Sequence, residues 1–71
     1  MQRLPISSST LKSAGYVGGV LEIEFRDGSV YRYLNVPAEV AQAFMTSDSK
    51  GRHFVRFIRG HYEFEKMVTP H

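Results

Sequence analysis

The sequence predicts a single α+β domain, built as a small antiparallel β-meander of three strands with two helices packed on one face. The first half of the chain alternates apolar and polar residues, which is typical of half-buried strands, and it places an Asp-Gly pair between two such segments. The second half replaces this alternation by apolar residues at helical spacing. Because 71 residues are fewer than a typical domain holds, we expect one domain over residues 1–71, with an ordered core over about 9–66.

Three strands are predicted in the first half of the chain. Residues 11–16 form a candidate short strand, which a glycine-rich turn ends. Residues 20–25 then alternate strictly, with leucine, isoleucine and phenylalanine on one face and both glutamates on the other. Residues 30–34 are rich in β-forming side chains and complete a hairpin. We expect Glu22 and Glu24 to lie in solvent on the polar face.

Two registers are open for this hairpin, and they place its tyrosines differently. A two-residue loop of Asp27 and Gly28 leaves Tyr31 and Tyr33 on the glutamate face, exposed. A three-residue loop adds Arg26 and puts the glycine in the left-handed bulge position, which moves both tyrosines to the apolar face. We favour the bulged form, because a core this small needs the aromatic rings.

A first helix is predicted after the hairpin. Pro37 suits the first helical position, and Glu39 lies in the first turn, where the helix dipole favours a negative charge. The polar residues 46–49 end this helix. Further along, residues 62–65 alternate again and form a candidate fourth strand at the C-terminus, after which we expect residues 67–71 to fray.

A second helix is predicted over residues 52–59, and it has two chemically different faces. At about 100° per residue, Arg52, Arg56 and Arg59 fall in one narrow stripe. Gly60 ends the helix at a C′-type position. The opposite, apolar arc consists of Phe54, Val55, Phe57 and Ile58.

The composition offers little for catalysis or metal binding. The absence of cysteine excludes disulfides, Cys-based zinc sites and a thiol nucleophile, and it is compatible with a reducing cytoplasm, which is the expected location. His53 and His61 lie eight residues apart, not at the spacing of a helical metal site, and no hydrolase or phosphate-loop motif occurs. No apolar run reaches the roughly 18 residues of a membrane span or resembles a signal peptide. We therefore expect no enzyme activity, cofactor, metal, membrane contact or small-molecule substrate.

The candidate binding surface is the basic segment over residues 50–62, which contains four cations, two histidines and no acid. Its charge exceeds the net charge of +2 of the whole chain. Cations beside exposed aromatic rings are typical of proteins that bind single-stranded RNA or DNA. An ordinary polar helix face is the alternative interpretation. The candidate nucleic-acid-binding residues are Lys50, Arg52, Arg56, Arg59, Tyr31 and Tyr33.

A series of short motifs occurs in a fixed order over residues 9–64: Gly15-Tyr16, Leu21-x-Ile23-x-Phe25, Asp27-Gly28, Tyr31-x-Tyr33, Val36-Pro37, Ser49-x-Gly51 and Ile58…Tyr62. In their order and spacing these motifs resemble the KTSC domain, a short module found at the C-terminus of some lysyl-tRNA synthetases and as a stand-alone bacterial or phage protein. Two positions depart from the family pattern, because Asp48 replaces a small residue and Val55 stands where asparagine is frequent. The resemblance implies a small α+β domain without known catalysis, for which RNA binding has been suggested from its attachment to a synthetase.

Two functions stay open on this basis. The first is an RNA-binding accessory module, whose affinity should fall steeply between about 50 and 200 mM salt. The second is a protein-interaction module that uses a sheet edge or an aromatic patch, with a homodimer among its expected assemblies. The hairpin register helps to decide between these two functions. In the bulged register the tyrosines lie in the core and are not available to stack on bases, which weakens the RNA-binding interpretation.

Overall fold

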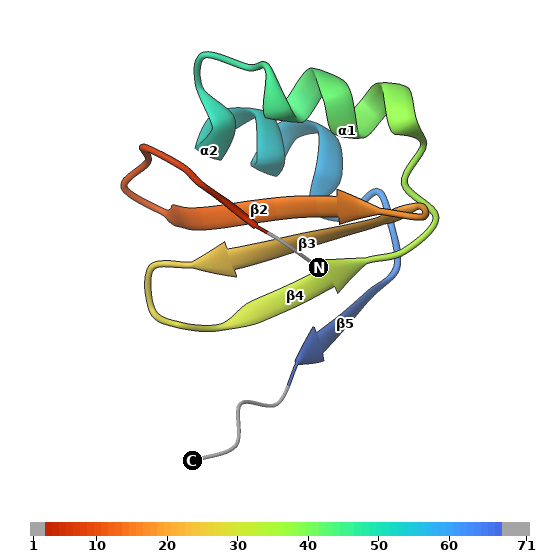
Figure 1. Cartoon of the computed structure of the whole chain (residues 1–71), viewed down its shortest axis with the longest axis horizontal. Helices are drawn as coiled ribbons and strands as arrows, with labels where there is room; N and C mark the ends of the chain where they lie inside the picture. Colours follow the sequence, from red (N-terminus) through yellow and green to blue (C-terminus); the bar gives the residue numbers. More distant parts are fainter. Residues whose placement is uncertain (1–2, 68–71) are drawn as a thin grey trace.

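The computed structural model describes residues 3–67 as a five-stranded antiparallel sheet with two helical segments on one face (Figure 1). The order of strands in the sheet follows their order in the chain, as in a meander. The strands are β1 (Leu4–Pro5), β2 (Leu11–Val17), β3 (Val20–Phe25), β4 (Val30–Tyr33) and β5 (Phe64–Met67). The helices are α1 (Ala38–Met45) and α2 (Lys50–His53), and α2 continues directly into the π-helical turn η1 (Phe54–Ile58). The predicted α+β class is confirmed, whereas the predicted number of strands is too low.

The additional strand comes from the N-terminal segment, which the sequence placed outside the ordered core. Leu4 pairs with Ala14 of β2, and Ile6 is buried with only 6% of its surface exposed. A two-residue strand is too short to show alternation, so nothing in the sequence pattern indicated it. The ordered core therefore begins well before residue 9.

The candidate fourth strand is present as β5, two residues further along the chain than expected. It pairs antiparallel with β4, with Phe64 opposite Tyr33 and Met67 opposite Val30. Met67, which was expected to fray, is thus part of the sheet. The rest of the expected frayed end, residues 68–71, lies outside the described residues.

The hairpin between β3 and β4 adopts the bulged register. Ile23 lies opposite Tyr31 and Leu21 lies opposite Tyr33, as this register requires. Gly28 has a φ angle of +92°, which a residue with a Cβ rarely adopts and which the bulge position needs. Both tyrosines therefore face the helices, which confirms the favoured register.

The predicted second helix is also confirmed, but fewer of its apolar residues are buried than predicted. Phe54 and Ile58, at the centre of the arc, are 2% and 0% exposed. Val55 and Phe57, at its two flanks, are 54% and 47% exposed, contrary to the prediction. A helix that covers a small sheet contacts it through only part of its circumference, so side chains at the flanks of its apolar arc reach solvent.

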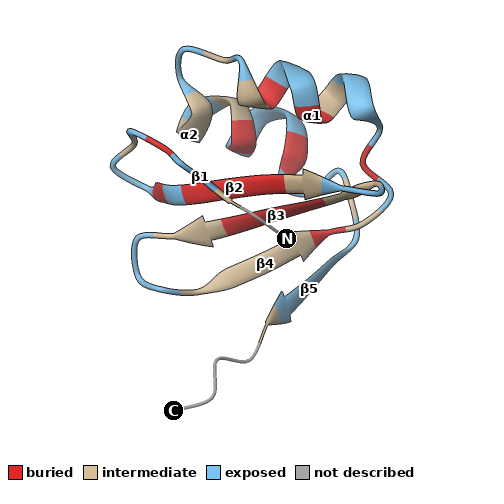
Figure 2. Cartoon of the chain, viewed as in Figure 1, coloured by how far each residue is buried: buried red, intermediate tan, exposed pale blue. Residues whose placement is uncertain are grey.

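The core lies between the sheet and the helices, and Figure 2 shows the buried positions along the central strands and the inner sides of the helices. A sheet with one apolar face needs such a cover, and α1 and α2–η1 together provide it. The fully buried large side chains are Phe44, Leu11, Leu21, Ile23, Ile58 and Val36. Within residues 3–67, no helix has the length and apolar character to cross a membrane.

Candidate functional site

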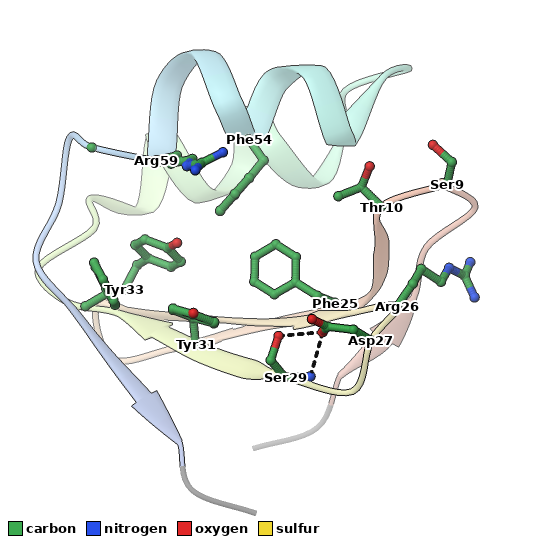
Figure 3. Close-up of a pocket in the computed structure, with 12 residues that line it drawn as sticks. Ser9, Thr10, Phe25, Arg26, Asp27, Ser29, Tyr31, Tyr33, Phe54 and Arg59 are labelled. Carbon is green, nitrogen blue, oxygen red and sulfur yellow. Dashed lines mark hydrogen bonds between the residues drawn. The ribbon is translucent and has the colours of Figure 1, made fainter.

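An open groove of about 600 Å³ lies between η1 and the hairpin end of the sheet (Figure 3). Each neighbouring element contributes an aromatic ring to it, and polar residues of the loops complete its rim. The aromatic residues that line it are Phe25, Tyr31, Tyr33, Phe54 and Phe64. We call this feature the aromatic groove.

The floor of the groove is fixed by edge-to-face contacts between rings. The ring of Phe54 meets that of Phe25 at a centroid distance of 5.5 Å and an angle of 73°, and that of Tyr33 at 5.4 Å and 76°. Phe25 in turn meets Tyr31 at 5.3 Å and 85°. Such perpendicular pairs are favourable beyond the area they bury, so the rings are held in place before any ligand binds.

The rings become progressively more exposed toward the mouth of the groove. Phe54 and Tyr33 are 2% and 4% exposed, Tyr31 is half-buried, and Phe64 is 54% exposed. Phe64 lies 5.3 Å from Tyr31, centroid to centroid. Burial raises the pKa of the Tyr33 hydroxyl above its ordinary value, so this residue stays neutral. The groove thus combines buried rings at its floor with exposed ring surface at its mouth that a ligand can contact.

Arg59 lies at the end of the groove near Tyr33, and the π-helical turn places it there. Its backbone N–H donates a hydrogen bond of 2.9 Å to the carbonyl of Phe54, five residues earlier, and closes the wide turn. The chain then leaves the helix, with Gly60 at a φ angle of +81°. The Arg59 side chain is exposed, and no carboxylate of residues 3–67 lies within ion-pair distance of it.

The opposite end of the groove, at the β3–β4 turn, is formed by Asp27 and Ser29. One carboxylate oxygen of Asp27, Oδ1, accepts hydrogen bonds from the Ser29 backbone N–H at 2.9 Å and from its hydroxyl at 2.6 Å. These hydrogen bonds lower the pKa of the Asp27 carboxyl below its ordinary value. The neighbouring Arg26 points away from the rings and donates to the backbone carbonyls of Ser8 and Ile6, so it holds the N-terminal segment in place (Figure 3).

A second, more polar cleft of about 320 Å³ adjoins the groove. Both are lined by Ser9 and Thr10, and Lys50 and Arg52 line the cleft from the side of α2. The Lys50 ammonium group donates a hydrogen bond of 3.0 Å to the carbonyl of Ser47, whereas Arg52 is exposed. The cleft therefore continues the groove toward two further cations.

Five of the six residues predicted to bind nucleic acid line the aromatic groove or the second cleft, and one lines neither. Tyr31, Tyr33 and Arg59 line the aromatic groove, and Lys50 and Arg52 line the second cleft. Arg56 lines neither, and its guanidinium carbon lies 5.5 Å from the centre of the Phe57 ring. The predicted single stripe is therefore not present: Arg59 lies at the C-cap, where the backbone has left helical geometry, and Arg56 lies apart from the groove and the cleft.

The groove contains functional candidates that the sequence did not indicate. Phe25 and Phe54 were predicted only as core residues, and Phe64 only as part of a strand. Asp27 was predicted only as a turn residue. The alternation over residues 62–65 was the one available signal for Phe64, but no local pattern shows that distant elements bring these side chains together.

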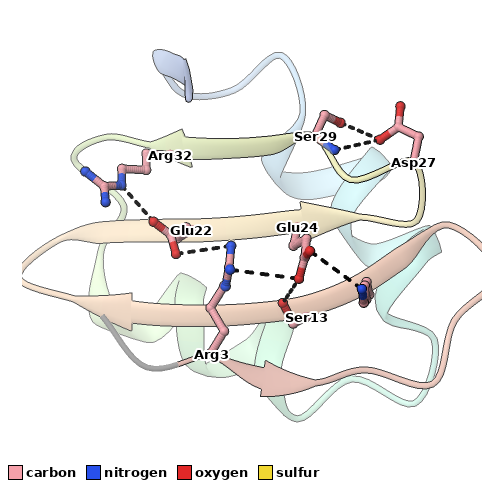
Figure 4. Close-up of polar contacts among 8 residues, drawn as sticks. Arg3, Ser13, Glu22, Glu24, Asp27, Ser29 and Arg32 are labelled. Carbon is pink, nitrogen blue, oxygen red and sulfur yellow. Dashed lines mark hydrogen bonds and ion pairs between the residues drawn. The ribbon is translucent and has the colours of Figure 1, made fainter. Parts of the chain in front are cut away.

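The outer face of the sheet carries a network of paired charges (Figure 4). The Glu22 carboxylate accepts from Nε of Arg32 at 2.7 Å, and it lies 3.4 Å from the guanidinium of Arg3. Glu22 is only 6% exposed, so the expectation that it lies in solvent was wrong: the two arginines cover it. Glu24 accepts a hydrogen bond of 2.8 Å from the hydroxyl of Ser13. Within residues 3–67, no three histidine, aspartate or glutamate side chains are grouped as metal ligands would be.

The fold and the groove define a small antiparallel α+β domain with an aromatic recess between its sheet and its last helix. The chain belongs to the KTSC domain family, whose model matches residues 7–62. The resemblance inferred from the sequence motifs is therefore confirmed.

Relatives of the chain occur both alone and as part of larger proteins. An uncharacterized protein of Stutzerimonas stutzeri is 45% identical over 70 residues, which cover 94% of this chain and 99% of the relative. The crystal structure of a KTSC domain protein from Yersinia pestis matches with a TM-score of 0.88 and 44% identity, and covers 94% of this chain and 97% of that one. A lysine–tRNA ligase of Nostoc punctiforme is 47% identical over 47 residues, which cover 66% of this chain but only 8% of the ligase.

Proposed function

We propose that this chain is a non-catalytic module that binds single-stranded RNA, with an unpaired base entering the aromatic groove and the phosphate backbone passing the cations at its rim. The observation that carries this proposal is an open groove with five aromatic rings and, at one end, an arginine without an ion-pair partner among the described residues. Stacking of a base on an aromatic side chain contributes about 1–3 kcal/mol.

The groove has the two kinds of ring that base stacking requires. Phe54 and Tyr33 are buried and give the floor a fixed shape, while Tyr31 and Phe64 present accessible ring surface at the mouth. The bulged register was expected to remove both tyrosines from any ligand. Because the helices cover this end of the sheet incompletely, Tyr31 faces the core and lines the open groove at once.

The cations near the groove are suited to phosphate. The planar guanidinium of Arg59 donates paired hydrogen bonds to phosphate oxygens. Lys66 lies at the mouth, with its ammonium nitrogen 5.9 Å from the centre of the Tyr31 ring. In the adjoining cleft, Lys50 and Arg52 extend the path along which a backbone would run.

The context of one relative also supports RNA as the ligand. The Nostoc punctiforme relative is a lysine–tRNA ligase, and it contains a segment 47% identical to this chain. An accessory RNA contact is a use that such a segment would have beside an enzyme that acts on tRNA. This support is an analogy of context.

A protein-interaction module is the second candidate function. Val55 and Phe57 are 54% and 47% exposed on the helical side and do not line the aromatic groove. Apolar side chains that gather into an exposed patch mark contact surfaces, and these two would contribute to such a patch. A protein partner on this surface would bind with little dependence on salt, unlike RNA.

The proposal is tested by titrating a fluorescently labelled single-stranded RNA with the protein and following anisotropy. We expect binding that weakens by at least about tenfold between about 50 and 200 mM salt. Phe64→Ala should weaken binding by about fivefold or more, because it removes a stacking surface. The matched control is Phe57→Ala, which removes a ring of similar exposure outside the groove and should leave RNA affinity unchanged.

Three results would contradict the proposal. These are no binding at low salt, binding that does not respond to salt, or equal losses from Phe64→Ala and Phe57→Ala. Circular dichroism of both variants shows whether the fold is retained, and Arg59→Gln, at an exposed position, provides a second variant that does not touch the packing of the rings.

A further inference from the structure

The two ends of the aromatic groove carry opposite charge. Arg59 lies at the end near Tyr33, where its positive charge acts on that hydroxyl, and Asp27 lies at the end formed by the β3–β4 turn (Figure 3). The aromatic floor separates the two. A groove with this arrangement orients a ligand that has a flat ring, an anionic group and hydrogen-bond donors.

Asp27 is equipped to accept hydrogen bonds and not to donate them. Its Oδ1 atom already accepts from the backbone and the hydroxyl of Ser29, at 2.9 and 2.6 Å. No hydrogen bond from residues 3–67 reaches its other oxygen, Oδ2. The pKa of this carboxyl is lowered by the Ser29 hydrogen bonds, so the group remains ionised near neutral pH. A ligand group beside Oδ2 must therefore be a donor.

We infer that the groove selects bases by their hydrogen-bond donors, with the Asp27 carboxylate accepting from the exocyclic amine of a base while Arg59 contacts the phosphate. Cytosine presents a donor, its N4 amine, where uracil presents the O4 carbonyl. The carboxylate would repel that carbonyl. The inference thus rests on the proposed RNA-binding function and adds a preference for cytosine over uracil.

Cytosine and uracil are the sharpest pair for a test, because their rings have the same size and would stack alike on Tyr31 and Phe64. The experiment measures the affinity of the protein for oligocytidylate and for oligouridylate of equal length, at neutral pH and one salt concentration. We expect the cytidine oligomer to bind about fivefold more tightly, as one charge-assisted hydrogen bond at a solvent-exposed site allows.

Two variants test whether the Asp27 carboxylate causes the preference, one at the turn and one outside the groove. Asp27→Asn keeps the shape of the side chain and its bond to the Ser29 backbone N–H, but its amide also offers donors, so the preference should fall to within about twofold. Phe57→Ala changes a residue outside the groove and leaves the carboxylate and its Ser29 hydrogen bonds in place, so the preference should be retained.

The outcomes distinguish this inference from the proposed function. If both oligomers bind equally to the wild-type protein, or if Asp27→Asn retains the full preference, base selection by Asp27 is wrong while RNA binding stands. If neither oligomer binds, the proposed function fails, and the inference fails with it.

Discussion

The two faces of the sheet differ in whether their charged side chains have partners within the chain. On the outer face, Glu22 is held by Arg32 and Arg3 and is almost fully buried beneath them. On the helical face, Arg59 stands at an aromatic groove with no ion-pair partner among residues 3–67. Counting basic residues therefore does not locate a binding surface, because a paired arginine stabilises the fold and an unpaired one is available to a ligand.

Breaking the outer network should have the largest effect on stability. Glu22→Gln removes the charge that Arg32 and Arg3 share, and we expect the free energy of unfolding to fall by about 1–2 kcal/mol, less than for a fully buried pair because both arginines are partly exposed. Urea denaturation measures the change. RNA affinity of the folded variant should stay at the wild-type value, and a loss of affinity would place the ligand on the outer face instead.

Replacing one arginine on each face sharpens the comparison, because both variants lower the net charge by the same amount. Arg59→Gln should weaken RNA binding by about fivefold and reduce the slope of log affinity against log salt by about 0.7, the contribution of one phosphate contact. Arg32→Gln changes the net charge equally, but it should lower stability and leave the slope unchanged. Equal slopes for the two variants would mean that only the net charge matters.

The smallest expected effect is a pH dependence of stability that comes from Tyr33. Unlike the charged residues of the outer face, Tyr33 is buried as a neutral group. Burial raises its pKa in the folded state above the ordinary value of 10.0. The stability that this neutral hydroxyl contributes is fully present below pH 10.0 and is lost as the pH rises through the folded-state pKa, because the unfolded chain releases the proton more readily. Between neutral and alkaline pH, Tyr33→Phe should therefore lose less stability than the wild type; parallel losses would contradict a raised pKa.

The sequence predicted those parts of the structure that local patterns determine. Strict alternation over residues 20–25 located β3, and Asp27-Gly28 together with the need for aromatic core residues led to the correct register. The same reasoning located a helix over residues 52–59, although not its π-helical turn. These features follow from side-chain periodicity and turn chemistry over a few neighbouring residues.

The groove could not be predicted in this way, because it depends on contacts between distant elements. Phe25, Phe54 and Phe64 come from three different elements, and only the assembled sheet and helix bring them together. A helical projection also treats Arg59 as a helix residue, whereas the chain turns away at that point. Likewise, the burial of Glu22 depends on Arg3, a residue of the N-terminal segment that carried no strand signal.

Chemical-shift mapping by NMR tests the central claim most directly, since it reports where a ligand contacts the folded protein. On titration with a short single-stranded RNA, we expect the largest changes at Tyr31, Arg59 and Phe64, and none at Glu22 or Arg32. Changes confined to the outer face, or to the surface around Phe57, would show that the aromatic groove is not the RNA-binding site.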